Sequence, residues 1–320
     1  MTVAAASLAG CSTYNPTSRS AALPNQGTPL PAPREGLEPA GWLSPARKSG
    51  PLLYVAAEQD NEILIYPENG YNQSPVGMIT SGVSKPYGLF VDQSGSLYVS
   101  NQNPPTVTVY APGSTDPSVT YSEGLERPLY SIVDQYGDLF VGNSSGYQCG
   151  TGTIVEYKTG SQNPYQTLSV PGREVDGMDF DQQGNLYAAY RRCGRRGGIV
   201  KFAPGSTEGQ RLDIKVYQPQ GLIVDDDGNI LVADSGSGAP RLDFYRVGKR
   251  YPALKFKLPF LNYPVQLAIT SDESRLFVSC FNEGHVFVTG YPLSASSTWT
   301  LEDNAPGQPQ GIALSNGQTF

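Results

Sequence analysis

A motif that returns six times along the chain constrains its fold more than any other feature of the sequence. In its clearest copy, residues 86–92 read Pro-Tyr-Gly-Leu-Phe-Val-Asp, followed by Gly95 and the apolar run Leu97–Val99. The last position of the motif is separated from its next copy by 42, 47, 44, 45 and 45 residues; it is occupied by Asp92, Asp134, Asp181, Asp225, Thr270 and Ser315. A fixed period in this range is typical of repeat architectures.

Each copy predicts a small antiparallel sheet. An apolar strand begins after the proline, Asp-x-x-Gly makes a turn, and a second apolar strand follows. A third strand ends in an aromatic residue, as at Val107–Tyr110 and Ile199–Phe202, and a more polar fourth strand comes after it. Near-continuous apolar runs indicate strands covered on both faces by neighbouring sheets. The sequence therefore predicts an all-β fold, a six-bladed β-propeller of four-stranded blades.

The two ends of the repeat region complement each other. Leu52–Val55 and Ile63–Tyr66 have the pattern of second and third strands with no first strand before them, whereas Gly311–Phe320 has the pattern of a first strand without a partner. Pairing of these segments would complete one blade from both termini and close the ring. The alternative is a seventh blade lost by truncation.

Composition limits the possible partners. The 320 residues include 36 Gly, 27 Pro and 20 Tyr, with 16% charged residues, which favours short strands and turns over helices. A formal net charge of -7 argues against a nucleic-acid partner, because phosphate binding needs a basic surface. With His285 as the one histidine, no site can use two imidazoles, and we expect a structural role for it.

The first fifty residues differ from the repeats. Leu8-Ala9-Gly10-Cys11 resembles a bacterial lipobox, in which the cysteine becomes the lipidated N-terminus, although residues 1–10 lack the Lys or Arg of a signal. The alternative is an ordinary cysteine in a flexible tail. Residues 12–50 contain seven prolines and predict a disordered tether, which leaves 51–320 for the propeller. We expect an exported monomer, lipid-anchored to the cell envelope (outer membrane or periplasmic face) or extracellular.

The repeat has a family resemblance. The copies share the pattern Pro-x-Gly-Leu-x-Val-Asp-x-x-Gly-x-Leu-Tyr-Val. By this pattern, residues 51–320 resemble the NHL-repeat propellers and are similar to the gluconolactonase and senescence-marker-protein family. The segment Leu97–Asn101 is similar to YVTN-type propellers. Such propellers include lactonases, lyases and binding modules, so the resemblance implies an architecture more than a function.

The lactonase-like members hold Ca²⁺ or another divalent cation with a Glu, an Asn and an Asp from different blades. Asp176 stands in the motif that carries the Asp, but Leu129 occupies the position of the Asn, and Glu58 only loosely replaces the Glu. Hard cations need several oxygen ligands. A metal-dependent lactonase, hydrolase or lyase with a degenerate site is therefore the alternative function. Otherwise Asp176 is a turn carboxylate that accepts backbone N–H groups.

One face of the propeller is the candidate binding surface. The start of each first strand and the loop between second and third strands open on the same face, so six equivalent residues should surround the channel mouth: Tyr87, Leu129, Asp176, Gln220, Val265 and Gln310. One loop on this face contains Arg191, Arg192, Arg195 and Arg196, which suit a carboxylate or phosphate. The alternative is a solvated loop paired with acidic neighbours such as Glu174.

Two of the remaining cysteines also lie on these loops, and the third ends a second strand. Cys149 and Cys193 occupy equivalent loops of adjacent blades and are predicted to form a disulfide, whereas Cys280 is predicted to be a buried free thiol. The function that the sequence favours is a non-catalytic binding or scaffolding propeller without a cofactor. Its mouth face would dock a protein, an anionic glycan or a small-molecule ligand.

Overall fold

The computed structural model describes residues 41–43, 50–69, 73–144, 150–236, 240–257, 263–282, 284–304 and 308–317. The chain divides into Met1–Pro33 and Arg34–Phe320. The first unit, including the predicted lipobox cysteine Cys11, lies outside the described residues. Within the described ranges the chain forms strands and turns without a helix, and no helix is long and apolar enough to cross a membrane.

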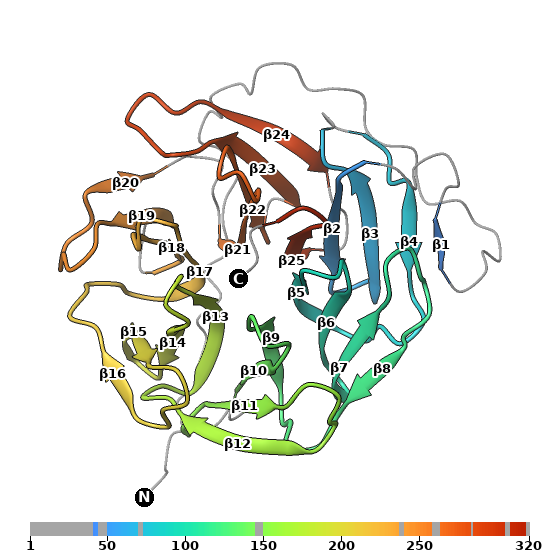
Figure 1. Cartoon of the computed structure of the whole chain (residues 1–320). Coiled ribbons are helices and arrows are strands. Elements are labelled where there is room, and N and C mark those ends of the chain that lie inside the picture. Colours follow the sequence, from blue (N-terminus) through green and yellow to red (C-terminus); the bar gives the residue numbers. More distant parts are fainter. Residues whose placement is uncertain are drawn as a thin grey trace, which may run out of the picture. The chain divides into compact units, whose positions relative to one another are not determined.

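Six antiparallel sheets form the blades of a β-propeller (Figure 1). The first blade contains β2 (Leu52–Ala57), β3 (Glu62–Pro67), β4 (Gly77–Ile79) and β25 (Pro309–Leu314). The second contains β5 (Pro86–Val91), β6 (Leu97–Gln102), β7 (Pro105–Tyr110) and β8 (Val119–Tyr121). The third contains β9 (Pro128–Val133), β10 (Leu139–Asn143), β11 (Thr153–Tyr157) and β12 (Pro164–Ser169).

The other three blades follow the same order. The fourth contains β13 (Glu174–Phe180), β14 (Leu186–Arg192), β15 (Arg195–Phe202) and β16 (Gly209–Arg211). The fifth contains β17 (Pro219–Val224), β18 (Ile230–Asp234), β19 (Arg241–Tyr245) and β20 (Leu254–Phe256). The sixth contains β21 (Pro264–Ile269), β22 (Arg275–Cys280), β23 (His285–Gly290) and β24 (Trp299–Asn304). The predicted all-β fold of six four-stranded blades is confirmed.

The ring closes through strands from the two ends of the propeller. β25 pairs with β2 in antiparallel register, with Leu53 opposite Leu314 and Val55 opposite Ile312. The innermost strands β25 and β5 also pack against each other, as the innermost strands of every other pair of neighbouring blades do (Figure 1). The predicted closure by N- and C-terminal strands is therefore confirmed, and the blade with divided strands is the first of six.

A short strand extends the first blade beyond the prediction. β1 (Trp42–Leu43) pairs with β4 and adds a fifth strand at its outer edge. The sequence analysis placed these two residues in the disordered tether, because they show no apolar periodicity. An outer strand presents unpaired backbone N–H and C=O groups, so two residues of passing chain can pair with it.

Four of the six repeat turns begin with an aspartate, and its carboxylate stabilises the turn. Asp92 Oδ1 accepts hydrogen bonds from the backbone N–H groups of Ser94 and Ser96 at 2.8 and 2.9 Å. Gly95 lies in the left-handed region, with φ of 82°, where a side chain would be strained. The sixth blade departs from this chemistry: Thr270 Oγ1 accepts from the backbone N–H of Ser274 at 3.2 Å, and Glu273 takes the left-handed position.

The third residue of the motif determines how closely the innermost strands approach. It is glycine in four blades, and a Cβ on Gly311 would lie 2.2 Å from the carbonyl oxygen of Tyr87 in the next blade. The other two blades carry Tyr130 and Gln266 at this position, and both side chains are buried. Gln266 reaches to the second blade, where its Nε2 donates to the carbonyl of Leu89 at 2.6 Å. Large side chains therefore fill part of the space around the central axis.

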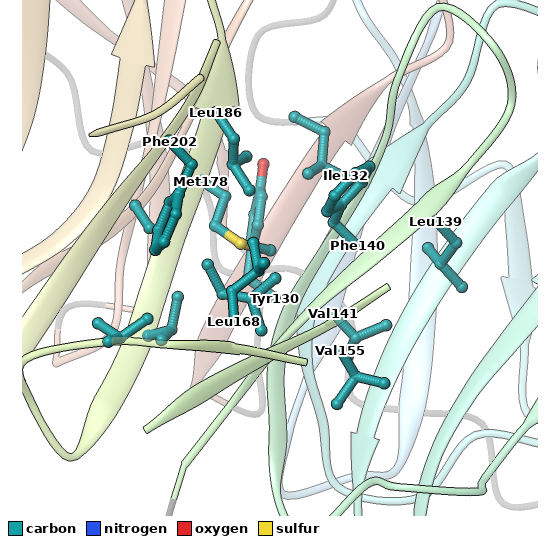
Figure 2. Packing of buried hydrophobic residues seen from close by; sticks show 14 of the residues in the cluster. Tyr130, Ile132, Leu139, Phe140, Val141, Val155, Leu168, Met178, Leu186 and Phe202 are labelled. Atoms are coloured by element: carbon teal, nitrogen blue, oxygen red, sulfur yellow. The ribbon is translucent and has the colours of Figure 1, made fainter. Parts of the chain in front are cut away.

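Apolar side chains from facing blades form the core between them. Between the third and fourth blades, Ile132 and Phe140 face Met178, Leu186 and Phe202 (Figure 2). The rings of Phe140 and Phe180 pack edge to face with centroids 5.4 Å apart. This packing explains the near-continuous apolar runs of the first two strands, because each has a neighbouring blade on both faces.

Candidate functional site

The six residues predicted to surround the channel mouth all lie at the start of the innermost strands, but none is open to solvent. Tyr87 is the most exposed of them at 6%. Tyr87, Leu129 and Val265 pack in one apolar cluster with Tyr263 and Phe281 above them. Gln220 contacts Tyr263 and Tyr87. The face therefore carries a closed layer of side chains where the sequence predicted an open ring.

An ion-pair network lies at the centre of this layer. Arg191, from the end of β14, donates Nε and Nη2 hydrogen bonds of 2.7 Å each to the two oxygens of Asp176. The same guanidinium lies 2.8 Å from Glu174 Oε2. Glu174 also pairs with Arg173 at 3.1 Å and with Arg127 at 3.5 Å. Two buried carboxylates are thus surrounded by three arginines from the third and fourth blades.

This geometry corrects both sequence interpretations of Asp176. The carboxylate does not accept turn N–H groups, because both of its oxygens are taken by Arg191. It also leaves no free oxygen for a cation. Among the described residues, no group of three or more His, Cys, Asp or Glu side chains is arranged to hold a metal ion. The alternative based on a lactonase-like metal site gains no support from Asp176.

Burial governs the electrostatics of the network. It raises the pKa of Asp176 above the ordinary value, although the guanidinium of Arg191 opposes this effect. The pKa of the Tyr87 hydroxyl is also raised by burial and by the Asp176 carboxylate. Burial lowers the pKa of Arg191, but the carboxylates of Asp176 and Glu174 outweigh it, so the guanidinium keeps its charge. Asp176 and Arg191 therefore stabilise each other as a desolvated pair.

Tyr263 covers the network from the loop before β21. Its hydroxyl accepts hydrogen bonds from Gln220 Nε2 at 3.1 Å and from Arg191 Nη1 at 3.5 Å. Its backbone is left-handed, with φ of 67°, and Lys85 and Gln308 share this conformation at equivalent positions before their prolines. Such backbone is strained for residues other than glycine and is maintained by the surrounding contacts. The conformation places the phenol over the innermost strands.

Arginines remain accessible at the rim of the same face. Arg192 is partly buried and pairs with none of the described side chains. Arg196 is exposed; its Nη2 donates to the hydroxyl of Tyr217 at 2.8 Å, and its guanidinium stacks on that ring at 4.2 Å. Arg195 begins β15, and its side chain lies outside the described part of the structure. The predicted arginine loop is thus divided: Arg191 pairs with buried acids, whereas Arg192 is half-buried and Arg196 is exposed.

The other predicted site residues have local partners. Gln310 Nε2 donates to Glu58 Oε2 at 2.6 Å on the first blade. Cys280 is a buried free thiol, as predicted. His285 begins β23 at the predicted place. Cys149 lies outside the described residues, so the Cys149–Cys193 disulfide stays a prediction.

Some residues of this face escaped the sequence analysis. Glu174 appeared there only as one possible neighbour of the arginine loop, yet it joins three arginines. No sequence motif singles out Tyr263 or Arg127. Both lie directly before a repeat proline, and this shared position is the signal that could have placed them beside the innermost strands.

Comparisons with known proteins identify the fold. No family model matches the chain, and no curated protein matches it. A total of 1176 solved chains match, so the architecture is too widespread to indicate a function. One belongs to a structure described as a nidogen/laminin complex, with a TM-score of 0.60 and 17% identity over 84% of this chain and 100% of that chain. Another is hydrazine synthase of Kuenenia stuttgartiensis, with a TM-score of 0.58 and 14% identity over 78% and 75%. At these identities the likeness shows the fold alone, and the fold is a β-propeller.

Proposed function

We propose that this protein is a non-catalytic binding propeller that docks an acidic protein surface on the mouth face. The observation that carries the proposal is the arginine-rich rim. Arg196 is exposed and Arg192 is half-buried, and Arg127 and Arg173 are also half-buried, with ion pairs to the buried Glu174. Guanidinium groups bind carboxylates in a bidentate geometry, and their stacking on aromatic rings suits protein interfaces.

Two further observations support a docking role. The closed layer around Tyr263 and Arg191 offers a firm surface, which suits recognition by shape and charge. One structural neighbour comes from a complex of nidogen with laminin, so a propeller of similar fold is part of a protein assembly there. The chain as a whole carries a net charge of -7, which makes the basic rim a local feature and not a general property of the surface.

The test uses poly-L-glutamate as the acidic probe, with binding to the full chain followed by fluorescence anisotropy. We expect binding that weakens at high salt, because exposed charges are screened. The double variant Arg192→Glu/Arg196→Glu should lose it. The matched control Arg246→Glu/Arg250→Glu reverses two exposed arginines beside the turn between β19 and β20, at the other end of the strands, and should retain it.

Two outcomes would contradict the proposal. One is no measurable binding of poly-L-glutamate by the wild type at low salt. The other is an equal loss in both double variants, because it would mean that overall charge and not the mouth face attracts the probe. If dextran sulfate binds at the rim and poly-L-glutamate does not, an anionic glycan replaces the acidic protein as the ligand.

We further propose an exported protein anchored through a lipid on Cys11. The support is the sequence Leu8-Ala9-Gly10-Cys11 followed by the proline-rich residues 12–50. Two acyl signals give stable membrane attachment, which a diacylated cysteine supplies. In a bacterial host, mass spectrometry should detect acyl chains on Cys11, and Cys11→Ser should move the protein out of the membrane fraction. An unmodified Cys11 in a soluble wild-type protein would refute the anchor.

A further inference from the structure

A recess between the third and fourth blades lies at the other ends of the strands from the arginine network. Its volume is about 500 Å³, which is within the range of small-ligand pockets. The turn at 134–138 forms one wall, and the turns at 181–184 and 203–206 form the opposite wall. These turns follow the innermost and third strands, whereas the mouth residues begin the innermost strands. The recess is therefore separate from the surface proposed above.

Two tyrosine rings stand exposed at this recess. Tyr136, in the turn between β9 and β10, is 73% exposed, and Tyr165 of β12 is 62% exposed. The lining includes buried apolar side chains from both blades, among them Phe140, Leu186 and Phe202, which belong to the core cluster of Figure 2. Large exposed aromatic rings that border a concave surface are a mark of a ligand site, because a ligand that covers them removes apolar area from water.

The turn that carries Tyr136 is held in place. Thr159 Oγ1 donates a 2.8 Å hydrogen bond to the carbonyl oxygen of Tyr136, and Asp138 Oδ1 accepts the backbone N–H of Thr159 at 2.9 Å. Gly137 between them has φ of 82°, and a Cβ there would lie 2.9 Å from Thr159 Oγ1. The exposed ring thus belongs to a fixed turn, so its position at the recess is prepared before a ligand arrives.

Charged groups at the recess exclude charged ligands. The Lys158 ammonium lies 2.8 Å from Asp138, 2.5 Å from Glu156 and 4.4 Å from the ring centre of Tyr165. Carboxylates beside an aromatic ring could bind a cationic ligand, but the Lys158 ammonium already occupies that position. The lining carboxylates, which also include Asp181, repel an anion. A neutral ligand remains.

Amide side chains supply the polar contacts that such a ligand needs. Gln135, Gln182 and Gln183 line the recess, and their side-chain amides make no hydrogen bond with a described residue. Each amide offers donors and an acceptor. A sugar hydroxyl also both donates and accepts, and the C–H face of a pyranose ring stacks on an aromatic side chain. This combination of apolar faces and hydroxyl edges matches exposed tyrosines next to free amides.

We propose that the recess binds a neutral pyranose oligosaccharide. The sugar rings stack on Tyr136 and Tyr165, and their hydroxyls bond to the amides of Gln135 and Gln183. The site does not depend on the arginines of the mouth face, so each of the two proposals can fail without the other. Together they describe a propeller that holds a protein on one face and a glycan on the other.

The test titrates cellohexaose, maltohexaose and chitohexaose into the full chain by isothermal calorimetry. We expect at least one of them to bind. Tyr136→Ala and Tyr165→Ala should each weaken that binding by about tenfold, which corresponds to the loss of one aromatic contact. Tyr251→Ala is the matched control, because Tyr251 is 60% exposed and lies in the fifth blade away from the recess. It should retain the wild-type affinity.

Three results would overturn this proposal. The first is that none of the three hexasaccharides binds. The second is that a bound hexasaccharide keeps its affinity in both Tyr136→Ala and Tyr165→Ala while all variants melt at the wild-type temperature. The third is that trilysine or a heparin hexasaccharide displaces the neutral sugar, because a charged competitor would show that the recess selects by charge.

Discussion

Arg191 and Asp176 form a bidentate ion pair beneath the mouth face, in which the guanidinium donates hydrogen bonds of 2.7 Å to both carboxylate oxygens. The pair connects the second strand of the fourth blade to its first strand. Glu174 and Tyr263 contact the same guanidinium from either side. The innermost end of the fourth blade therefore depends on one arginine.

Removal of this arginine should destabilise the protein strongly. Arg191→Ala leaves Asp176 and Glu174 buried without their central partner, and we expect a loss of about 3–5 kcal/mol in the free energy of unfolding. Arg192→Ala, the adjacent control, should change it by less than about 0.5 kcal/mol. Urea denaturation checks both variants. Equal stability of Arg191→Ala and Arg192→Ala would show that the ion pair is not structurally important.

Asp179 should give the stability a distinctive pH dependence. Burial raises the pKa of this carboxyl well above its ordinary value of 3.8, although the backbone N–H groups of Val224 and Phe180 oppose the effect. The folded state then binds the proton more tightly than the unfolded chain does. Asp179 therefore favours folding below its ordinary pKa, and this contribution is lost as the pH rises through the folded-state pKa.

The matching measurement compares the wild type with Asp179→Asn by urea denaturation at a series of pH values. As the pH rises from about 4 upward, the unfolding free energy of the wild type should fall relative to that of the variant. Asp272→Asn is the control, because hydroxyl groups of Thr270 and Ser274 lower the pKa of Asp272 to about 2. The unfolding free energy of the wild type should fall relative to that of Asp272→Asn only at acidic pH, and it should do so as the pH decreases. A constant difference for Asp179→Asn would contradict the raised pKa.

The closing contact of the ring should not tolerate a methyl group. Gly311→Ala places a Cβ 2.2 Å from the carbonyl oxygen of Tyr87, and the backbone of two strands cannot move apart without loosening the ring. We expect a loss of about 1–3 kcal/mol, seen as a lower melting temperature. Gly290→Ala, at the end of β23, meets nothing closer than 4.0 Å and should be nearly neutral. A neutral Gly311→Ala would mean that the innermost strands are packed more loosely.

A disulfide between Cys149 and Cys193 remains a prediction. Cys193 lies in the turn between β14 and β15, and Cys280 is a buried free thiol, so Cys280 does not compete for the bond. Peptide mass spectrometry without reduction should detect a linked Cys149–Cys193 pair. Its reduction should lower the free energy of unfolding by about 4 kcal/mol, since the bond closes a loop of roughly 45 residues. Free thiols at both positions, or a link from Cys193 to Cys11, would contradict the pairing.

The sequence determined the number of blades, the turn in each of them and the strand pair that closes the ring. These features follow from local rules. Along the chain, apolar strands alternate with Asp-x-x-Gly turns, as around Asp92 and Gly95. Each repeat unit also has apolar faces that only a neighbouring unit can cover. The first unit begins without an innermost strand, and the C-terminal end supplies one. The ring can therefore be completed only by pairing these two segments, as β2 and β25 do.

Only the tertiary structure decided which residues reach the solvent. Asp176 and Tyr87 stand where the motif predicts, but they are buried with Arg191, from the end of β14, and Tyr263, from the loop before β21, which the repeat does not encode. In the same way, the tertiary structure brings the exposed Tyr136 and Tyr165 to one recess with residues of the neighbouring blade. The physical reason is that burial and pairing are set by contacts between side chains distant in sequence, whereas strand and turn formation depends on neighbours along the chain.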